Sequence, residues 1–435
     1  MKYAKLYGWL DEKCAAIEDA ELAKLFRSCF LSTLTTTVKE QRDGSVYVST
    51  GDIPAMWLRD SSAQVEVYAR LCGVDEDVRA LIRGVLRRQF FYIGIDPYAN
   101  AFNEEANGRG HKDITLRNDW VWERKFEIDS LCYPMRLAEK YYEYSGDASV
   151  FDESFRETAR TVLRVFETEQ DHAARSDYSF LREGEYSQDS LENGGKGGYC
   201  KQNGLVWSAF RPSDDRNRYG YLIPANMFIV SVMRFLRRVF TEIVAEPELA
   251  ARCAALAESV ERGLAACAAV PDGDGGMLYA YETDGAGNAF VADDANLPSL
   301  LSVPYFGYGS TGDAVYRNTR RHILSRKNRY YYEGAFAKGV GSPHTPENHI
   351  WPLALLAQGL TAESDGEKLE ILGMLATTHN GTYHMHESFD KDDPSRFTRA
   401  WFGWADSLFA EYFLQNFELF RKYRVKKIEM IRGKR

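Results

Sequence analysis

Two carboxylate-bearing segments, far apart in the chain, carry residue types suited to acid–base chemistry. Asp214 and Asp215 stand in a Pro-Ser-Asp-Asp turn, and Glu387 stands in a His-Glu-Ser-Phe segment. Hydrolysis of a glycosidic bond needs one protonated carboxyl group and one carboxylate, which separate loops can supply across a sugar pocket. Each residue also has a structural interpretation. The aspartates are common turn residues, and Glu387 could pair with Arg396 or Arg399.

The segment Trp57–Asp60 has the side chains of a sugar-binding site. A Trp ring can stack on the apolar face of a pyranose, while Arg59 and Asp60 can hydrogen-bond to neighbouring hydroxyls. The alternative is an arginine–aspartate pair that only holds a loop. Two further segments, 96–103 and 120–129, combine aromatic rings with amides and charges. They would line the same cleft or form buried polar networks.

The histidines raise the question of a metal site. His344 and His349 form one pair near in sequence, and His384 and His386 form another. Neither spacing matches the HExxH motif or a compact His/Cys set. We therefore expect no metal and no other cofactor, and we expect these histidines to hydrogen-bond to sugar hydroxyls or to loop backbone.

The rest of the chain predicts the elements that would position these residues. In 247–267, apolar residues recur at steps of three and four, the period of an amphipathic helix. The same pattern predicts a helix over 155–166 and one that opens near Ser61. Further helices are expected at 11–38, 77–92, 127–145, 224–244, 312–325, 347–361, 366–378 and 399–422. Few strands are expected, with short ones at 45–50 and 277–282.

Three of the polar segments lead into a predicted helix. Ser61 and Gln64 form a capping-box pattern, Pro224 stands at a helix start, and Thr345 with Pro346 has the form of an N-cap followed by the first helical residue. Polar side chains at the entries of inner helices would converge on one end of a helical ring. That arrangement predicts a pocket walled by aromatic rings and floored by carboxylates.

About a dozen paired helices, with no linker rich in proline and serine, predict an all-α toroid rather than several domains. We expect residues 1–435 to form this single domain, with a basic C-terminal tail at about 421–435. The formal charge of −9 argues against a nucleic-acid partner. The chain contains no run of 18 apolar residues, so we predict no membrane span. Seven cysteines without CxxC spacing predict a reducing cytoplasm.

Eight motifs, in order along most of the chain, resemble glycoside hydrolase family 125, the bacterial and fungal exo-α-1,6-mannosidases. The motifs are GDIPAMWLRDSSAQV from Gly51, DPYANAFN from Asp96, WVWERKFEIDSLCYP from Trp120, FRPSDD from Phe210, IPANMF from Ile223, DDANLPSLLS from Asp293, SPHTPENHIWP from Ser342 and MHESFDKDDPSRFTRAWF from Met385. The resemblance implies an (α/α)6 barrel, a mannose-containing glycan as substrate, inversion at the anomeric carbon and no metal.

The resemblance also implies a role for individual residues. The general acid is the aspartate that lands on Asp214, with Asp215 as the close alternative, and the general base lands on Glu387. The implied contacts to the terminal mannose are Trp57, Arg59, Asp60 and His344, and also Arg211, Glu123, Asn348 and Trp351. The acid must stay protonated near neutral pH, and the charge of Asp215 is a candidate for raising its pKa.

Two other functions stay open. Sugar 2-epimerases also use (α/α)6 barrels, with paired histidines as acid and base, which would move the chemistry to His344, His349, His384 or His386. The high aromatic content of 13% would also fit a glycan-binding protein that is not an enzyme.

Overall fold

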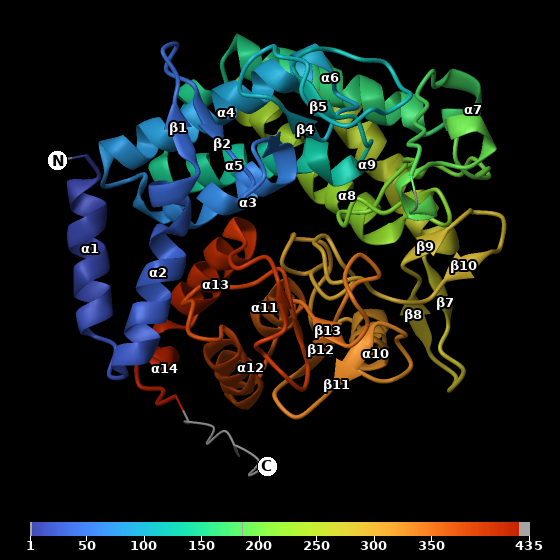
Figure 1. Ribbon diagram of the computed structural model, residues 1–435. Helices are drawn as coiled ribbons and strands as arrows, with labels where there is room; N and C mark the ends of the chain where they lie inside the picture. Colours follow the sequence, from blue (N-terminus) through green and yellow to red (C-terminus); the bar gives the residue numbers. More distant parts are fainter. Residues whose placement is uncertain (1, 185, 426–435) are drawn as a thin grey trace.

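The computed structural model describes residues 2–184 and 186–425, and most of that chain is helical. The helices form two rings of an (α/α)6 barrel, in which outer and inner helices alternate along the chain (Figure 1). The inner helices are α3 (Leu58–Glu66), α5 (Ile128–Ser145), α8 (Ile223–Arg238), α11 (Pro352–Leu360) and α13 (Gly403–Gln415). The outer helices are α2 (Ala20–Thr36), α4 (Glu76–Ile95), α6 (Glu153–Glu169), α9 (Pro247–Cys267), α10 (Ala314–Ile323) and α12 (Asp365–Thr378). Outside this alternation lie α1 (Ala4–Ala15), α7 (His172–Arg175) and α14 (Phe417–Phe420).

Burial distinguishes the two rings. In α13, every residue from Gly403 to Phe413 is buried, as expected for a helix surrounded by other elements. In the outer helix α6, burial follows a stripe that includes Phe155, Ala159, Val162 and Phe166. Buried apolar residues from α1 through to α14 belong to one large core cluster. The inner ring is therefore packed on all sides, and the outer ring covers it.

The fourth inner position of the barrel holds turns instead of a helix. Between α9 and α10, residues 297–308 contain no helix or strand. Phe306 packs on Phe228 of α8, with ring centroids 4.4 Å apart. The Tyr305 hydroxyl donates a hydrogen bond to Glu411 of α13 at 3.0 Å. These contacts place the segment inside the ring.

Short antiparallel strands stand at the entries of the inner helices. Three sheets have the strand orders β3–β4–β5, β10–β9–β6 and β13–β14–β15. Their strands are β3 (Met56–Trp57), β4 (Ala101–Phe102), β5 (Val121–Glu123), β6 (Tyr221–Leu222), β9 (Glu282–Thr283), β10 (Ala289–Phe290), β13 (His349–Ile350), β14 (Ser388–Asp390) and β15 (Phe397–Thr398). Two-stranded hairpins are β1 (Val38–Glu40) with β2 (Val46–Val48), β7 (Ala269–Pro271) with β8 (Met277–Tyr279), and β11 (Tyr331–Glu333) with β12 (Lys338–Val340). Because α3 and α8 begin directly after β3 and β6, the sheets fix where these helices start.

The structure confirms the predicted all-α class and corrects several element boundaries. The predicted helix 247–267 coincides with α9. The predicted helix 11–38 is two helices, because Asp19 caps α2 by accepting a hydrogen bond from the Leu22 amide at 3.0 Å. The predicted strands at 45–50 and 277–282 are present as β2 and β8, but the expectation of few strands is wrong, since the described residues contain fifteen, each of two or three residues.

Two predicted helix caps are also wrong. Ser61 does not cap α3, which begins earlier at Leu58, and its hydroxyl donates to the Trp57 carbonyl at 2.6 Å. Thr345 does not begin α11. Its hydroxyl accepts a hydrogen bond from the Trp351 indole at 2.8 Å, and the helix starts at Pro352. In both places the chain forms strand contacts before it becomes helical.

Within residues 2–184 and 186–425, no helix is long and apolar enough to cross a membrane. Of the predicted basic tail at about 421–435, residues 426–435 lie outside the described part of the chain.

Candidate active site

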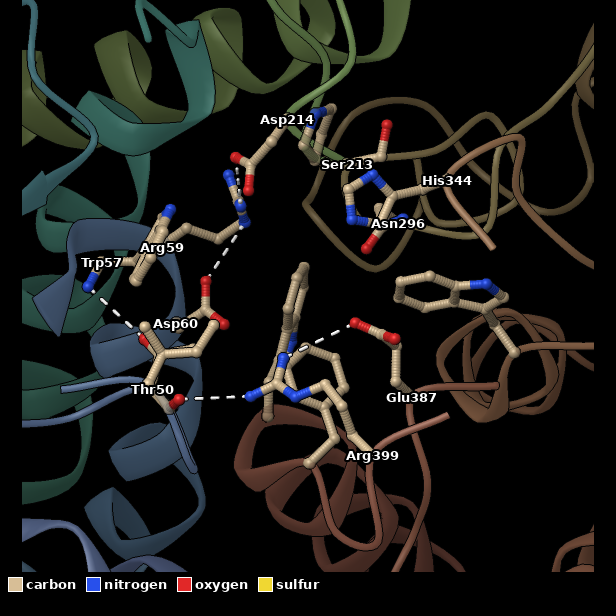
Figure 2. Close-up of a pocket in the computed structure, with 15 residues that line it drawn as sticks. Thr50, Trp57, Arg59, Asp60, Ser213, Asp214, Asn296, His344, Glu387 and Arg399 are labelled. Atoms are coloured by element: carbon tan, nitrogen blue, oxygen red, sulfur yellow. Dashed lines mark hydrogen bonds and ion pairs between the residues drawn. The ribbon is translucent and has the colours of Figure 1, made fainter. Parts of the chain in front are cut away.

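A pocket of about 130 Å³ opens where the inner helices begin (Figure 2). Its walls combine aromatic rings, charged side chains and amide or hydroxyl groups. The lining residues are Thr50, Ile53, Trp57, Arg59, Asp60, Pro212, Ser213, Asp214, Asn296, His344, Trp351, Glu387, Arg399, Phe402 and Trp404. The prediction that polar residues at helix entries converge on one end of the barrel is therefore confirmed. Seven of the residues expected from the sequence are among them.

Arg59, in the first turn of α3, shares its guanidinium among four carboxyl groups. Its Nη1 lies 2.5 Å from Glu127 and 3.1 Å from Asp129, its Nε lies 3.4 Å from Asp60, and its Nη2 lies 3.6 Å from Asp214. Except for Asp214, all these side chains are buried. One positive charge cannot neutralise four carboxylates out of contact with water, so part of the cluster must hold protons.

The pKa shifts of the buried carboxyls follow from this crowding. Burial raises the pKa of Asp60 to about 6, against the opposing charge of Arg59. Burial likewise raises the pKa of Asp129 to about 6. Burial raises the pKa of Glu127 well above its usual range, and the charges of Asp214 and Asp129 raise it further. Glu127 is thus the carboxyl of this cluster that we expect to be protonated at neutral pH.

Asp214 reaches the pocket through an unusual backbone conformation. Its φ of 65° lies in the left-handed region, which aspartate tolerates better than most residues do. The Lys125 ammonium donates to the Asp214 carbonyl at 2.6 Å and holds the loop in place. Asp215 does not line the cavity. It accepts a hydrogen bond from Ser213 at 3.1 Å and faces the His344 imidazole at 3.6 Å. Of the two adjacent aspartates, Asp214 is therefore the pocket carboxyl.

The protonation of Asp214 differs from the sequence-based expectation. Burial raises the pKa of its carboxyl, but a hydrogen bond from Glu127 and the charges of Arg59, Lys125 and His344 lower it more, so that it falls below its usual range. The direction of the pKa shift of this aspartate is therefore opposite to the expected rise. The physical reason is the contact with Glu127, which comes from a distant segment that only the fold brings against Asp214.

Glu387 lies on the wall across from Asp214 (Figure 2). It directly precedes β14, whose pairing with β13 and β15 fixes the segment. Its carboxylate lies 3.6 Å from Arg399 Nη1 and its side chain is 13% exposed, so water or a substrate can reach it. The predicted structural partner Arg399 is therefore present, and it stands inside the pocket. Arg399 in turn donates to Asp52 at 2.6 Å, which anchors it to the loop before β3.

His344 contributes a positive charge near Asp214. Burial opposes its protonation, but the hydrogen bond and charge of Asp215, with the charges of Asp214 and Glu387, raise the pKa of His344 to about 9. Its side chain is 39% exposed. The imidazolium therefore faces the cavity at neutral pH and can donate hydrogen bonds to a ligand.

Three of the expected substrate contacts do not line this pocket. Glu123 is buried behind it, 2.7 Å from Arg182. Arg211 pairs with Glu282 and lines a separate cavity of about 510 Å³. Asn348 is exposed on the surface. The sequence places these residues beside pocket residues, but each side chain lies elsewhere.

Several lining residues were not singled out from the sequence. Phe402 and Trp404 stand at the entry of α13, and Asn296 lies in the turns after β10. Asn296 and Phe402 fall within the motifs quoted above, so a signal was present for them, whereas Trp404 lies two positions after the last motif. What the sequence does not show is which side chain of a motif faces the cavity.

The histidine-based alternative finds little support in this geometry. Only His344 among the four candidate histidines lines the pocket. His349 contacts the Ser388 hydroxyl at 3.0 Å, His384 contacts Asp406 at 2.8 Å, and His386 stacks on Phe397. Among the described residues, the pocket therefore offers paired carboxyls but no pair of histidines for acid and base roles.

Comparison with known proteins agrees with this chemistry. The family described as metal-independent α-mannosidase (GH125) matches residues 19–414. A solved structure of a metal-independent α-mannosidase from Streptococcus pneumoniae, in a non-productive complex with α-1,6-mannobiose, is 44% identical. It superposes with a TM-score of 0.94, covering 96% of this chain and 100% of that chain. The meiotically up-regulated gene 157 protein of Schizosaccharomyces pombe is 35% identical over 425 residues, which cover 92% of this chain and 83% of that protein.

A more distant structure shares the fold alone. A bacterial glucoamylase complexed with acarbose is 12% identical with a TM-score of 0.55, covering 91% of this chain and 55% of that chain.

Proposed function

The chain belongs to glycoside hydrolase family 125, the metal-independent α-mannosidases, and on this premise we propose that it removes terminal α-1,6-linked mannose with inversion at the anomeric carbon. The α-1,6 linkage is the one in the disaccharide bound to the Streptococcus pneumoniae relative. The observation that carries the mechanism is the pocket itself, which presents the carboxyls of Asp214 and Glu387 from separate loops.

Asp214 is the proposed general acid and Glu387 the proposed general base. Asp214 donates a proton to the glycosidic oxygen as the bond from C1 to that oxygen breaks. Glu387 removes a proton from a water molecule that attacks C1 from the opposite face. Inversion requires the two carboxyl groups to be about 6.5–9.5 Å apart, which leaves room for this water. Their origin on facing walls supports that arrangement.

The size and lining of the pocket support action on chain ends. Its volume of about 130 Å³ is small beside the roughly 300–1,000 Å³ of typical ligand sites, and it suits one sugar ring better than a chain segment. Trp57 offers a ring face to that sugar, and Arg59 with Asp60 offers charged hydrogen-bonding groups. His344 and Trp351 complete the opposite side. The expected contacts of Glu123, Arg211 and Asn348 with the terminal mannose are not part of this proposal, because none of the three lines the pocket.

We test this function by incubating the enzyme with α-1,6-, α-1,3- and α-1,2-linked mannobiose and measuring released mannose. Rapid release from the α-1,6 isomer alone is expected. A mannan should yield free mannose first, since only chain ends enter the pocket. Early long fragments would contradict exo action. Binding of mannan without release of mannose would favour a glycan-binding protein, and conversion of free mannose to another hexose would favour an epimerase.

Two further expectations accompany this function. We infer that the chain forms the single domain expected for residues 1–435, because one large core cluster contains buried residues from Tyr3 to Phe420. We also infer a cytoplasmic location, since four of the seven cysteines, all in the described part of the chain, pack as buried apolar residues and none is in a disulfide.

A further inference from the structure

Glu127 lies directly behind the pocket carboxyl. Its side chain is 0% exposed, and Arg59 contacts both carboxyl groups, with Nη1 2.5 Å from Glu127 and Nη2 3.6 Å from Asp214. Asn100 lies between the two carboxyls, with its Nδ2 3.3 Å from Asp214 and 3.5 Å from Glu127, and it also donates to Glu123 at 2.9 Å.

The Arg59 guanidinium also pairs with Asp60 and Asp129. Four carboxyl groups crowded around one buried positive charge cannot all be ionised without a large cost in free energy, so the cluster favours a proton on the buried member of this pair.

We propose that Glu127 is a positioning residue that stores the proton of the general acid and passes it to Asp214 as the glycosidic bond breaks. The proposal rests on the proposed function, in which Asp214 is the acid. It goes further by assigning the resting place of the proton to a residue that does not touch the substrate.

The surroundings of Glu127 fix its carboxyl and favour this transfer. The Glu127 Oε2 atom accepts hydrogen bonds from Arg59 at 2.5 Å and from the Ser130 hydroxyl at 2.8 Å. Glu127 is fully buried and does not line the pocket, whereas Asp214 lines it and is 24% exposed, so a proton held on Glu127 can reach a pocket ligand through Asp214. Burial and the neighbouring negative charges raise the pKa of Glu127, which agrees with its role as the protonated member.

Charged groups face the pair from each adjoining segment, and their balance sets which carboxyl holds the proton. As the glycosidic bond breaks, negative charge builds up on the glycosidic oxygen and draws the proton from Glu127 towards Asp214. The bound substrate also displaces water from the pocket wall at Asp214, which strengthens this attraction. The facing groups are Arg59 and Asp60 from α3, Glu123 from β5, Lys125 from the segment before α5, Asp129 from α5, and Asp215 with His344 from the loops.

The proton balance closes over one turnover. A proton moves from Glu127 to Asp214, and from Asp214 to the glycosidic oxygen, which leaves with the bonding electron pair. Water adds to C1 and gives a proton to Glu387. The Glu127–Asp214 pair is then one proton short and Glu387 holds one extra, so exchange with solvent restores both.

The test compares two substrates in the Glu127→Gln variant. The amide keeps the shape of the side chain and can donate to Asp214, but it stores no acidic proton. We expect kcat/KM for α-1,6-mannobiose at pH 7 to fall about 100-fold or more, within the usual range for general acid catalysis. A dinitrophenyl α-mannoside, whose leaving group needs no proton, should lose less than about 10-fold. The activity on the disaccharide should also recover as pH falls, because Asp214 can then be protonated from solvent.

The matched control is Asp129→Asn. Asp129 is equally buried and pairs with the same Arg59 Nη1 atom at 3.1 Å, but Asn100 does not join it to Asp214. It should change the rates for both substrates by a similar factor. Equal losses on both substrates in Glu127→Gln, or an unchanged pH profile, would overturn the proposal. If Glu127→Gln does not fold, Asn100→Ala loosens the same contact and must change the two substrates unequally, or the proposal fails. A wild-type enzyme that cleaves no α-1,6-mannobiose would instead refute the proposed function.

Discussion

Replacing Arg59 with methionine should destabilise the protein in a way that depends on pH. The change keeps an unbranched side chain but removes the one guanidinium that lies within 3.6 Å of Asp60, Glu127, Asp129 and Asp214. Removing one partner of a buried ion pair costs about 3–5 kcal/mol. We expect a loss of that size in the free energy of unfolding at pH 7.5, measured by urea denaturation with circular dichroism.

The loss should shrink at pH 5. Asp60 and Asp129 have a pKa of about 6 with the guanidinium present, and removal of a positive charge raises both further. Above pH 6 the folded variant therefore binds more protons than the folded wild type. One extra bound proton changes the difference in the free energy of unfolding between the two proteins by about 1.4 kcal/mol per pH unit. Over the roughly 1.5 units from pH 7.5 down to 6, the deficit should fall by about 2 kcal/mol for one such carboxyl.

The double variant Arg59→Met with Asp129→Asn provides the control. Removing a carboxyl together with the guanidinium should restore part of the stability at pH 7.5, because fewer buried charges are left without a partner. Equal losses at both pH values for Arg59→Met, or a double variant that loses the sum of the single losses, would refute the electrostatic interpretation of this cluster.

Four further results are expected together. Activity should survive EDTA, and a loss restored by zinc or calcium would contradict a metal-independent mechanism. Asp214→Asn keeps a residue tolerant of the left-handed backbone and should lose about 100-fold or more on α-1,6-mannobiose but less on an aryl mannoside. If Asp215→Asn shows this substrate dependence and Asp214→Asn does not, then Asp215 is the general acid. Glu387→Gln should reduce turnover about 100-fold or more on both substrates, since its amide cannot take a proton from water. The melting temperature should fall as pH rises from 5 to 7, because carboxyls with raised pKa stabilise the fold only while protonated, and Asp129→Asn should reduce that slope.

The sequence predicted the helical elements well where local pattern decides them. Helix α9 lies over the predicted 247–267, because its apolar stripe is continuous and nothing distant interrupts it. Prediction failed at the helix entries, where Trp57 pairs with Ala101 across β3 and β4. Such contacts between distant segments leave no periodic signal in either segment.

The candidate site was also predictable only in part. The motifs and their order pointed to Asp214 and Glu387, and the structure places both in one pocket. The proximity of Glu127 and Asp214 was not predictable from the sequence. It depends on the packing of the residue before α5 against a loop 87 positions further along the chain, and such long-range packing leaves no local sequence pattern.

The stereochemistry of the product tests the mechanism most directly. Proton NMR of the first turnovers on an α-mannoside should show β-mannose before mutarotation produces the α form, because water attacks the face opposite the bond that Asp214 protonates. If α-mannose appears first, Glu387 acts as a nucleophile that forms a covalent intermediate, and the acid–base roles proposed for this pocket are wrong.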